Sequence, residues 1–160
     1  MTILFLHGLE SSGNGTKGRF FKEHFPQMLV PDFTGSLESR LQQLEMLCQG
    51  NDDIILVGSS FGGLMGACFA AAHPARVKKL VLMAPALNFP GFLVPKEKIS
   101  APTLLLIGNL DDVTPADKVV PLAEKTFANL EVIRVEEDHL LHHSFLELDW
   151  PSLLEESAST

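Results

Sequence analysis

Ser60 stands at the centre of a G-x-S-x-G pattern, residues 58–62 (GSSFG). An apolar segment, residues 54–57, precedes the pattern, and a helix-length segment rich in glycine and alanine follows it. A strand-to-helix turn this sharp strains the backbone of its central residue and leaves little room for side chains two positions to either side, so glycine is favoured there. Such a turn lifts the Ser60 hydroxyl to the carboxyl end of a sheet, where it can act as a nucleophile.

A serine hydroxyl is a weak nucleophile unless a base removes its proton and an acid orients the base. Residues 103–107 are apolar and precede the neighbouring acids Asp111 and Asp112. Residues 130–135 (LEVIRV) are rich in β-branched residues, form another predicted strand and precede His139. Because the carboxyl ends of parallel strands gather at one edge of a sheet, the serine, one acid and the histidine can converge there. Their chain order is that of the nucleophile-elbow architecture. The G-x-x-D-x-x-T-P motif at residues 108–115 favours Asp111 and leaves Asp112 as the alternative acid.

The first apolar segment, residues 3–6, leads directly into His7, Gly8 and Leu9. Its carboxyl end faces the same edge of a parallel sheet, so the backbone N–H of Leu9 can pair with that of Phe61. Two such preorganised donors stabilise a developing oxyanion by about 3 kcal/mol each. We therefore expect Leu9 and Phe61 to form an oxyanion hole.

Short apolar segments alternate with helix-length segments along the whole chain. Continuous apolar strands suit a sheet covered on both faces, with parallel strands and helices between them. We predict an α/β fold with a minimal, mostly parallel sheet of about six strands and helices on both faces, in one domain over residues 1–160, a length that suits a single core. The predicted strands lie at residues 3–6, 28–30, 54–57, 79–83, 103–107 and 130–135. Helices are predicted at residues 37–48 after the N-cap Ser36, at 116–126 despite Pro121, and at 143–154.

Residues 85–102 are the one irregular stretch, with four prolines and an apolar centre. A loop this long inside a compact domain is usually functional or mobile. We expect it to form a small lid or pocket wall that leaves Ser60 open and favours small or exposed acyl groups. Leu87, Phe89 and Phe92 are the candidate substrate-binding side chains, with packing against the sheet as the alternative.

The composition limits the classes of binding partner and the cellular compartment that we expect. The chain has 20 acidic and 12 basic residues and a formal net charge of −8, which argues against nucleic acid because such binding depends on clustered Lys and Arg. Three acids, residues 136–138, place part of this negative charge beside His139. Cys48 and Cys68 lie among apolar neighbours outside any C-x-x-C spacing and are expected to be buried thiols. No stretch approaches the ~20 apolar residues of a membrane span, so we expect a cytoplasmic protein; the oligomeric state is not indicated.

These motifs together resemble the α/β-hydrolase superfamily, and most of all its short, cap-poor serine esterases, over nearly the whole chain. The motifs that carry the resemblance are His7-Gly8, residues 58–63, Asp111 with Thr114-Pro115, and Asp138-His139. The resemblance implies that Ser60 is the nucleophile and that His139 is the general base and then the acid. It implies Asp111 as the orienting carboxylate, and Leu9 and Phe61 as oxyanion donors. It also implies that His7 is a structural residue that packs behind the oxyanion loop. The implied reaction is acyl transfer from a small-molecule carboxylic ester, with a small or medium acyl group, to water through an acyl-serine intermediate, without a metal or organic cofactor.

Three other interpretations stay open. Residues 13–18 (GNGTKG) fit the dinucleotide pattern G-x-G-x-x-G, with Asp32 about 20 residues on, but they begin well beyond the end of the first predicted strand. His139, His142 and His143 with Asp138 have the spacing of a metal cluster on one helix face, although no H-E-x-x-H occurs. A non-catalytic binding module on the same fold is the third interpretation. Among enzymes, thioesterase and lipase-like activities are the alternatives.

Overall fold

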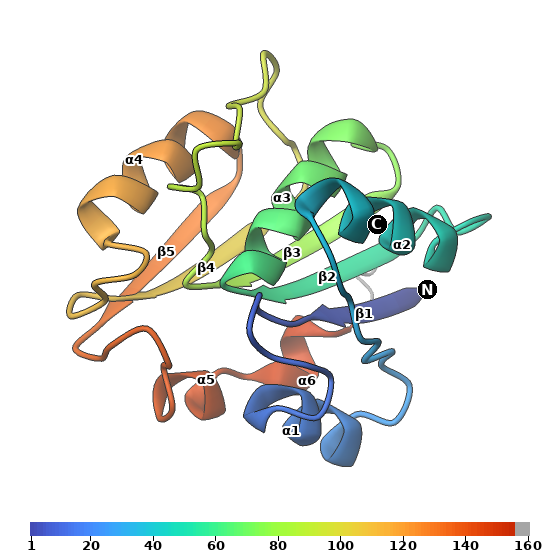
Figure 1. Ribbon diagram of the computed structural model, residues 1–160, viewed down its shortest axis with the longest axis horizontal. Coiled ribbons are helices and arrows are strands. Elements are labelled where there is room, and N and C mark those ends of the chain that lie inside the picture. The colour runs from blue at the N-terminus through green and yellow to red at the C-terminus, as the bar shows by residue number, and fades with distance from the viewer. Residues whose placement is uncertain (156–160) are drawn as a thin grey trace.

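Five parallel strands form a single sheet in the computed structural model, which describes residues 1–155 (Figure 1). The strands are β1 (Thr2–Leu6), β2 (Ile54–Ser59), β3 (Val77–Met83), β4 (Thr103–Gly108) and β5 (Leu130–Val135). They lie in the sheet in chain order, and every neighbouring pair is parallel. The predicted α/β class and parallel sheet are confirmed.

Helices cover both faces of this sheet, as predicted (Figure 1). One face carries α2 (Leu37–Leu47), α3 (Phe61–Ala72) and α4 (Ala116–Thr126), and the other carries α1 (Thr16–His24), α5 (Ser144–Glu147) and α6 (Trp150–Leu153). Within residues 1–155, no helix combines the length and the hydropathy needed to cross a bilayer.

The apolar strands divide their side chains between two cores. Leu4 and Leu6 of β1 belong to the core under α2, α3 and α4, whereas Ile3 and Phe5 belong to the core under α1, α5 and α6. Successive side chains of a strand point to opposite faces, so a strand with a helix layer on each side must be apolar throughout. This explains why β1, β2 and β4 are nearly continuous apolar runs in the sequence.

The prediction of about six strands is wrong by one. Residues 28–30 contribute only a single bridge, in which the Leu29 N–H donates to Ile3 O at 2.8 Å and the Phe5 N–H donates to Leu29 O at 2.9 Å. Pro26 and Pro31 flank this segment. In this ladder the next N–H toward β1 would come from residue 31, and proline has none to donate, so the pairing stops after Leu29.

The helix predicted at residues 143–154 is also wrong, because the structure has two short helices there, α5 and α6. Pro151 lies in the first turn of α6, where its missing N–H is tolerated. Asp149 caps that helix by accepting a hydrogen bond from the Ser152 N–H at 3.3 Å. The buried Trp150 ties the two helices together, because its Nε1–H donates to Phe145 O at 2.6 Å.

The other two predicted helices are present. Ser36 caps α2 by accepting a hydrogen bond from the Ser39 N–H at 3.1 Å, and α4 continues through Pro121. Cys48 and Cys68 are free thiols, the first buried and the second half-buried. Burial raises the pKa of each thiol to about 11, so both are protonated and unreactive at neutral pH.

Close packing of α3 on β1 gives the first testable prediction. A Cβ added at Gly62 would collide with the backbone of Leu6 and His7, so Gly62→Ala should lower the free energy of unfolding by about 1–3 kcal/mol or more. Gly66→Ala in the same helix is the matched control, because its Cβ would meet side-chain carbons at an ordinary 3.6 Å and alanine is the better helix former. Urea unfolding measures both variants; equal stabilities would contradict the packing argument.

Candidate active site

Ser60 occupies the strained turn between β2 and α3 that the sequence predicts. Its backbone has φ 55° and ψ −115°, a region that non-glycine residues rarely adopt. The Ser60 N–H donates to Met83 O at 2.9 Å, and the Ala86 N–H donates to Ser60 O at 2.9 Å. A Cβ at Gly58 would meet Gly62 O at 2.5 Å, and a Cβ at Gly62 would collide with the backbone of Leu6 and His7, which explains why both flanking positions are glycine.

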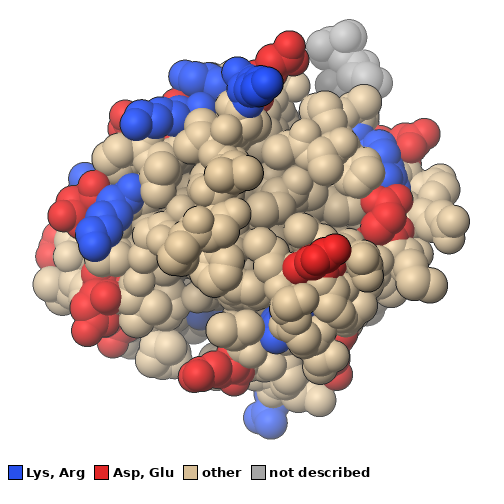
Figure 2. All heavy atoms as spheres, turned by 45° about the horizontal axis from the view of Figure 1, so that its top comes forward, with Lys and Arg blue, Asp and Glu red and all other residues tan. Residues whose placement is uncertain are grey.

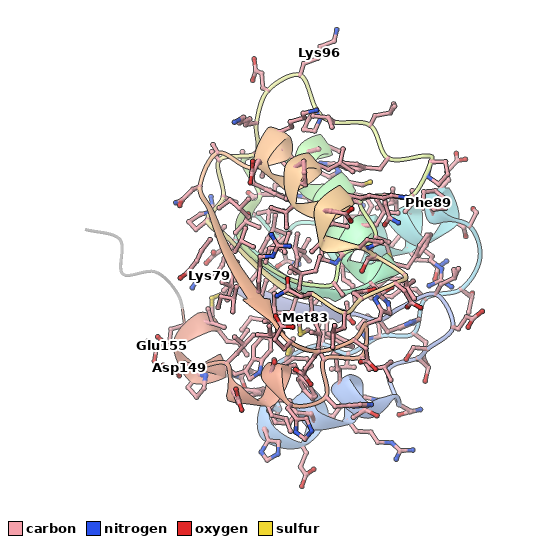
Figure 3. The ribbon with its side chains drawn as sticks, turned by 90° about the vertical axis from the view of Figure 1, so that its left-hand side faces the viewer. Lys79, Met83, Phe89, Lys96, Asp149 and Glu155 are labelled. Carbon is pink, nitrogen blue, oxygen red and sulfur yellow. The ribbon has the colours of Figure 1, made fainter. Side chains whose placement is uncertain are left out.

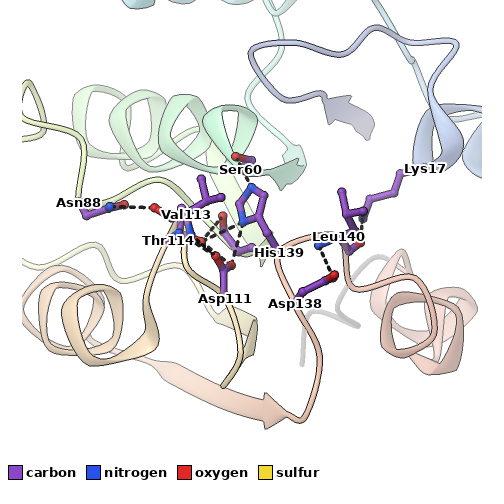
Figure 4. A network of polar contacts seen from close by, with 10 residues as sticks. Lys17, Ser60, Asn88, Asp111, Val113, Thr114, Asp138, His139 and Leu140 are labelled. Carbon is purple, nitrogen blue, oxygen red and sulfur yellow. Dashed lines mark hydrogen bonds and ion pairs between the residues drawn. The ribbon is translucent and has the colours of Figure 1, made fainter.

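His139 joins the Ser60 hydroxyl to a carboxylate (Figure 4). Its Nε2 lies 2.9 Å from Ser60 Oγ, and its Nδ1 lies 2.8 Å from Asp111 Oδ2. A carboxylate accepts hydrogen bonds, so Nδ1 carries the ring proton and Nε2 is left to accept the hydrogen of Ser60. Asp112, the alternative acid, is exposed to solvent and does not contact the ring.

The loop after β4 holds the Asp111 carboxylate in place. The N–H groups of Val113 and Thr114 each donate to Asp111 Oδ1 at 2.8 Å, and the Thr114 hydroxyl donates to Oδ2 at 2.7 Å. Burial by itself raises the pKa of Asp111, but the hydrogen bonds from Thr114 and His139 outweigh it and hold the pKa below its ordinary value. Asp111 is therefore ionised at neutral pH. From the sequence, Thr114 was named only as part of a motif and was not assigned this role in holding Asp111. The D-x-x-T spacing of Asp111 and Thr114 is the signal that could have indicated it.

His7 fixes the loop that follows β1. Its Nε2 accepts a hydrogen bond from the Phe33 N–H at 2.8 Å, so its Nδ1 carries the proton and donates to Gly8 O at 2.7 Å. The C=O and N–H of a trans peptide point in opposite directions. Because Gly8 O faces His7, the Leu9 N–H in the same peptide points away from His7.

Two backbone N–H groups near Ser60, those of Leu9 and Phe61, are free to donate. Within residues 1–155, neither the Leu9 N–H nor the Phe61 N–H donates a hydrogen bond to another protein group. Phe61 is the first residue of α3, where a backbone N–H has no acceptor within the helix. Both residues line the same cavity as Ser60 and His139.

This cavity has a volume of about 720 Å³, within the range of small-molecule sites. Of the three candidate substrate-binding residues, the structure places Phe89 in its wall. The Phe89 ring packs edge-on against that of Phe61, with 5.6 Å between the ring centroids. Leu87 is 1% exposed and belongs to the core, and Phe92 packs against that core. The expectation that Leu87 and Phe92 line the pocket is thus corrected in favour of the alternative, packing on the protein interior.

Residues 85–102 contain no helix or strand, as their prolines predict. Their first part is fastened to the site, because Asn88 Nδ2 donates to Val113 O at 3.1 Å (Figure 4). Their far part projects away from it, with Leu93 83% exposed and Lys96 at the tip of the loop (Figure 3). The near part is a cavity wall, whereas motion of the segment as a lid stays a prediction.

A lysine that the sequence did not single out lies at the other end of the cavity. Lys17 Nζ donates to Leu140 O at 2.7 Å (Figure 4) and lies 5.0 Å from the centroid of the Phe145 ring. Burial lowers the pKa of Lys17, and the nearby Glu137 and Asp138 partly oppose this effect. Through its hydrogen bond to Leu140 O, Lys17 connects the beginning of α1 to the loop that carries His139.

The three acids before His139 accept hydrogen bonds that hold its loop in place. Glu136 accepts a hydrogen bond from Asn109 Nδ2 at 2.5 Å, and Asp138 accepts one from the Leu140 N–H at 3.0 Å. Glu137 accepts bonds from the Ser144 N–H at 2.8 Å and the Ser144 hydroxyl. Burial raises the pKa of Glu137, but these hydrogen bonds outweigh it and lower the pKa overall. The acids therefore hold the loop that positions His139.

The dinucleotide-like pattern at residues 13–18 serves local packing. The Gly13 N–H donates to Asp32 Oδ1 at 2.7 Å, so the acid that would bind a ribose is bonded to the loop itself. A Cβ at Gly18 would collide with the backbone of Gly13. In the part of the chain that the structure describes, no three His, Cys, Asp or Glu side chains are placed to hold a metal ion.

The hydrogen bonds on Asp111 predict a pH-dependent stability. Its folded-state pKa lies below the ordinary 3.8, so the ionised carboxylate stabilises the fold above that value, and this contribution is lost as the pH falls through the folded-state pKa. Asp111→Asn should therefore be destabilised most at neutral pH, and its unfolding midpoint should approach that of the wild type as the pH falls below 3.8. The exposed Asp112→Asn is the control. A gap that stays constant over the pH range would contradict the prediction.

Known proteins resemble this chain in sequence and in fold. The sequence model of a family described as alpha/beta hydrolase fold matches residues 34–98. Lipase LipV of Mycobacterium tuberculosis is 27% identical over 143 residues, which cover 81% of this chain and 52% of the lipase, so the chain spans about half the length of this relative. Alpha/beta hydrolase domain-containing protein 10 from mouse superimposes with a TM-score of 0.76 at 18% identity, over 90% of this chain and 84% of the mouse chain. A marine microorganism esterase also gives 0.76 at 18% identity, over 96% of this chain and 95% of its own. The fold built on this parallel sheet and its strained serine turn is that of the α/β hydrolases, and the family model and the lipase support the resemblance to the α/β-hydrolase superfamily in sequence.

Proposed function

We propose that this protein is a serine hydrolase that cleaves carboxylic esters of small or medium acyl groups. The observation that carries the proposal is the hydrogen-bond chain from Asp111 Oδ2 through His139 to Ser60 Oγ at the wall of a cavity. An esterase and a lipase are among the proteins similar to this chain, which supports the same reaction class.

In the first half of the reaction, His139 Nε2 takes the proton of Ser60 while Ser60 Oγ attacks the carbonyl carbon of the ester. The carbonyl oxygen becomes negative and accepts hydrogen bonds from the N–H groups of Leu9 and Phe61. The ionised Asp111 stabilises the imidazolium that forms, and its lowered pKa suits that role.

The protonated His139 then donates its proton to the leaving alcohol oxygen as the carbon–oxygen bond breaks, which leaves the acyl group on Ser60. In the second half, His139 takes a proton from water, and the hydroxyl attacks the acyl-serine carbonyl. The same two N–H groups stabilise the second oxyanion, and the acid product leaves with Ser60 protonated again. Each step uses groups of this chain and one water molecule.

The cavity suggests how the substrate lies. Phe89, Pro90 and Val113 form an apolar end of its lining, whereas Lys17 and His142 contribute polar groups. In Figure 4, Val113 and Lys17 lie on opposite sides of Ser60 and His139. We propose that the acyl group occupies the apolar end beside Phe89, and that the alcohol part lies toward Lys17.

Covalent labelling tests the nucleophile. A fluorophosphonate probe should add to Ser60, because His139 is placed to remove its proton. Ser60→Ala should abolish both labelling and the hydrolysis of p-nitrophenyl butyrate, and His139→Ala should do nearly the same. Asp111→Asn should lose most of the activity, whereas the exposed Asp112→Asn should keep it. An intact mass that stays unchanged after long incubation with the probe would count against the proposal and favour a non-catalytic binding module.

A panel of p-nitrophenyl esters tests the position of the acyl group. Acetate and butyrate should be cleaved faster than long-chain esters, and Phe89→Ala should shift the preference toward longer chains, because it removes a ring from the cavity wall. Phe92→Ala is the matched control, since it removes the same ring, from the same loop, outside the cavity. An unaltered chain-length profile in Phe89→Ala would place the acyl group elsewhere.

A further inference from the structure

A buried arginine contacts both residues that hold the free backbone donors. Arg40 of α2 is 4% exposed, and its Nη2 donates to Leu9 O at 3.3 Å. Its guanidinium carbon lies 5.3 Å from the centroid of the Phe61 ring, over the ring face. Its Nε donates to Gly35 O at 2.9 Å, which fixes the direction of the side chain.

The charge of Arg40 has no counter-ion nearby. Among the described residues, no carboxylate oxygen lies within 4.0 Å of its guanidinium, and its Nη1 has no hydrogen-bond partner. Burial lowers the pKa of Arg40, yet an arginine side chain stays protonated in proteins. A buried, unpaired charge opposes folding, so Arg40 is an unusual residue at a position that packing alone would fill with an apolar side chain.

The hydrogen bond from Arg40 completes the support of the Leu9 backbone. His7 holds the carbonyl of Gly8, on the peptide that carries the Leu9 N–H, and Arg40 holds the next carbonyl, that of Leu9. Both peptides on either side of the Leu9 Cα are thus fixed. Donors that are fixed before the reaction stabilise an oxyanion without reorganising, and a buried positive charge adds a favourable potential for negative charge near it.

We propose that Arg40 is a positioning residue for the oxyanion: it holds the Leu9 peptide and the Phe61 ring in place and supplies the positive potential that favours the negatively charged transition state. This role rests on the proposed function, because it requires an ester carbonyl to become an oxyanion at the Leu9 and Phe61 N–H groups. Sequence reasoning passed over Arg40, which reads there as one polar residue of an amphipathic helix.

The test compares Arg40→Met, which keeps much of the stem but removes the charge, with Arg40→Lys, which keeps the charge but not the fork. Each variant is assayed for kcat and KM on p-nitrophenyl butyrate and for inhibition by a trifluoromethyl ketone, whose adduct with serine is an oxyanion. Binding of a neutral butyl amide serves as the ground-state comparison. Gln43→Met is the matched control, because Gln43 also ties α2 to its neighbouring loop, through Thr34, but it does not contact Leu9 or Phe61. Circular dichroism and thermal unfolding report on the fold of each variant.

Arg40→Met should lower kcat by roughly 10- to 100-fold and weaken the ketone by a similar factor, with KM and amide binding nearly unchanged. Arg40→Lys should fall between Arg40→Met and the wild type. Equal losses in Gln43→Met, or a lower Tm for Arg40→Met with kcat intact, would overturn the role and leave the proposed function standing. If Arg40→Met fails to fold, a wild-type kcat in Arg40→Lys would overturn the role of Arg40. A wild-type protein that cleaves none of the esters overturns the proposed function and the role of Arg40 together.

Discussion

A sheet of parallel strands with helices on both faces is the constraint on which the site depends. Each connection must cross one face of the sheet and return to the same end, so the carboxyl ends of all five strands lie along one edge. Ser60 follows β2 directly, Asp111 follows β4 within three residues, and His139 follows β5 within four. The direction of the strands therefore gathers these residues at one edge before any contact between their side chains forms.

The main chain at this edge is held by hydrogen bonds between neighbouring strand ends. The Ser60 N–H reaches Met83 O at 2.9 Å, and the Ala84 N–H reaches Leu106 O at 2.8 Å. Ser60 and Ala84 both have positive φ, 55° and 45°, and backbone strain of this kind costs about 1–3 kcal/mol per residue. It persists because the ladders on either side fix both residues. The Thr114 hydroxyl lies 3.4 Å from Ala84 O and 2.7 Å from Asp111 Oδ2, so this strained edge also supports the acid that faces His139.

The sequence was sufficient wherever the answer depended on chain order and strand direction, and insufficient wherever it depended on where one side chain points. Order alone indicated the acid-bearing loop, but only the amides of the folded loop select Asp111 over Asp112. Apolar character predicted a strand at residues 28–30, but its pairing stops after Leu29, because Pro31 has no N–H to donate. Phe89 and Leu87 lie in a segment without periodicity, so no pattern tells which of them faces the cavity and which faces the core.

The composition gives the net charge of the chain, but only the fold shows which charged side chains are buried. The chain has a formal net charge of −8, and on the face drawn in Figure 2 acidic and basic side chains are interspersed. Within residues 1–155, Asp111 and Arg40 are the charged residues that expose less than a tenth of their surface. They are not paired with each other: the carboxylate faces the Nδ1 side of His139, and the guanidinium lies behind Leu9 and Phe61. In the proposed reaction, positive charge develops on His139 and negative charge on the substrate carbonyl. The negative Asp111 thus lies beside the ring that becomes positive, and the positive Arg40 lies behind the residues that would bind the oxygen that becomes negative. This arrangement favours the transition state over the neutral ground state.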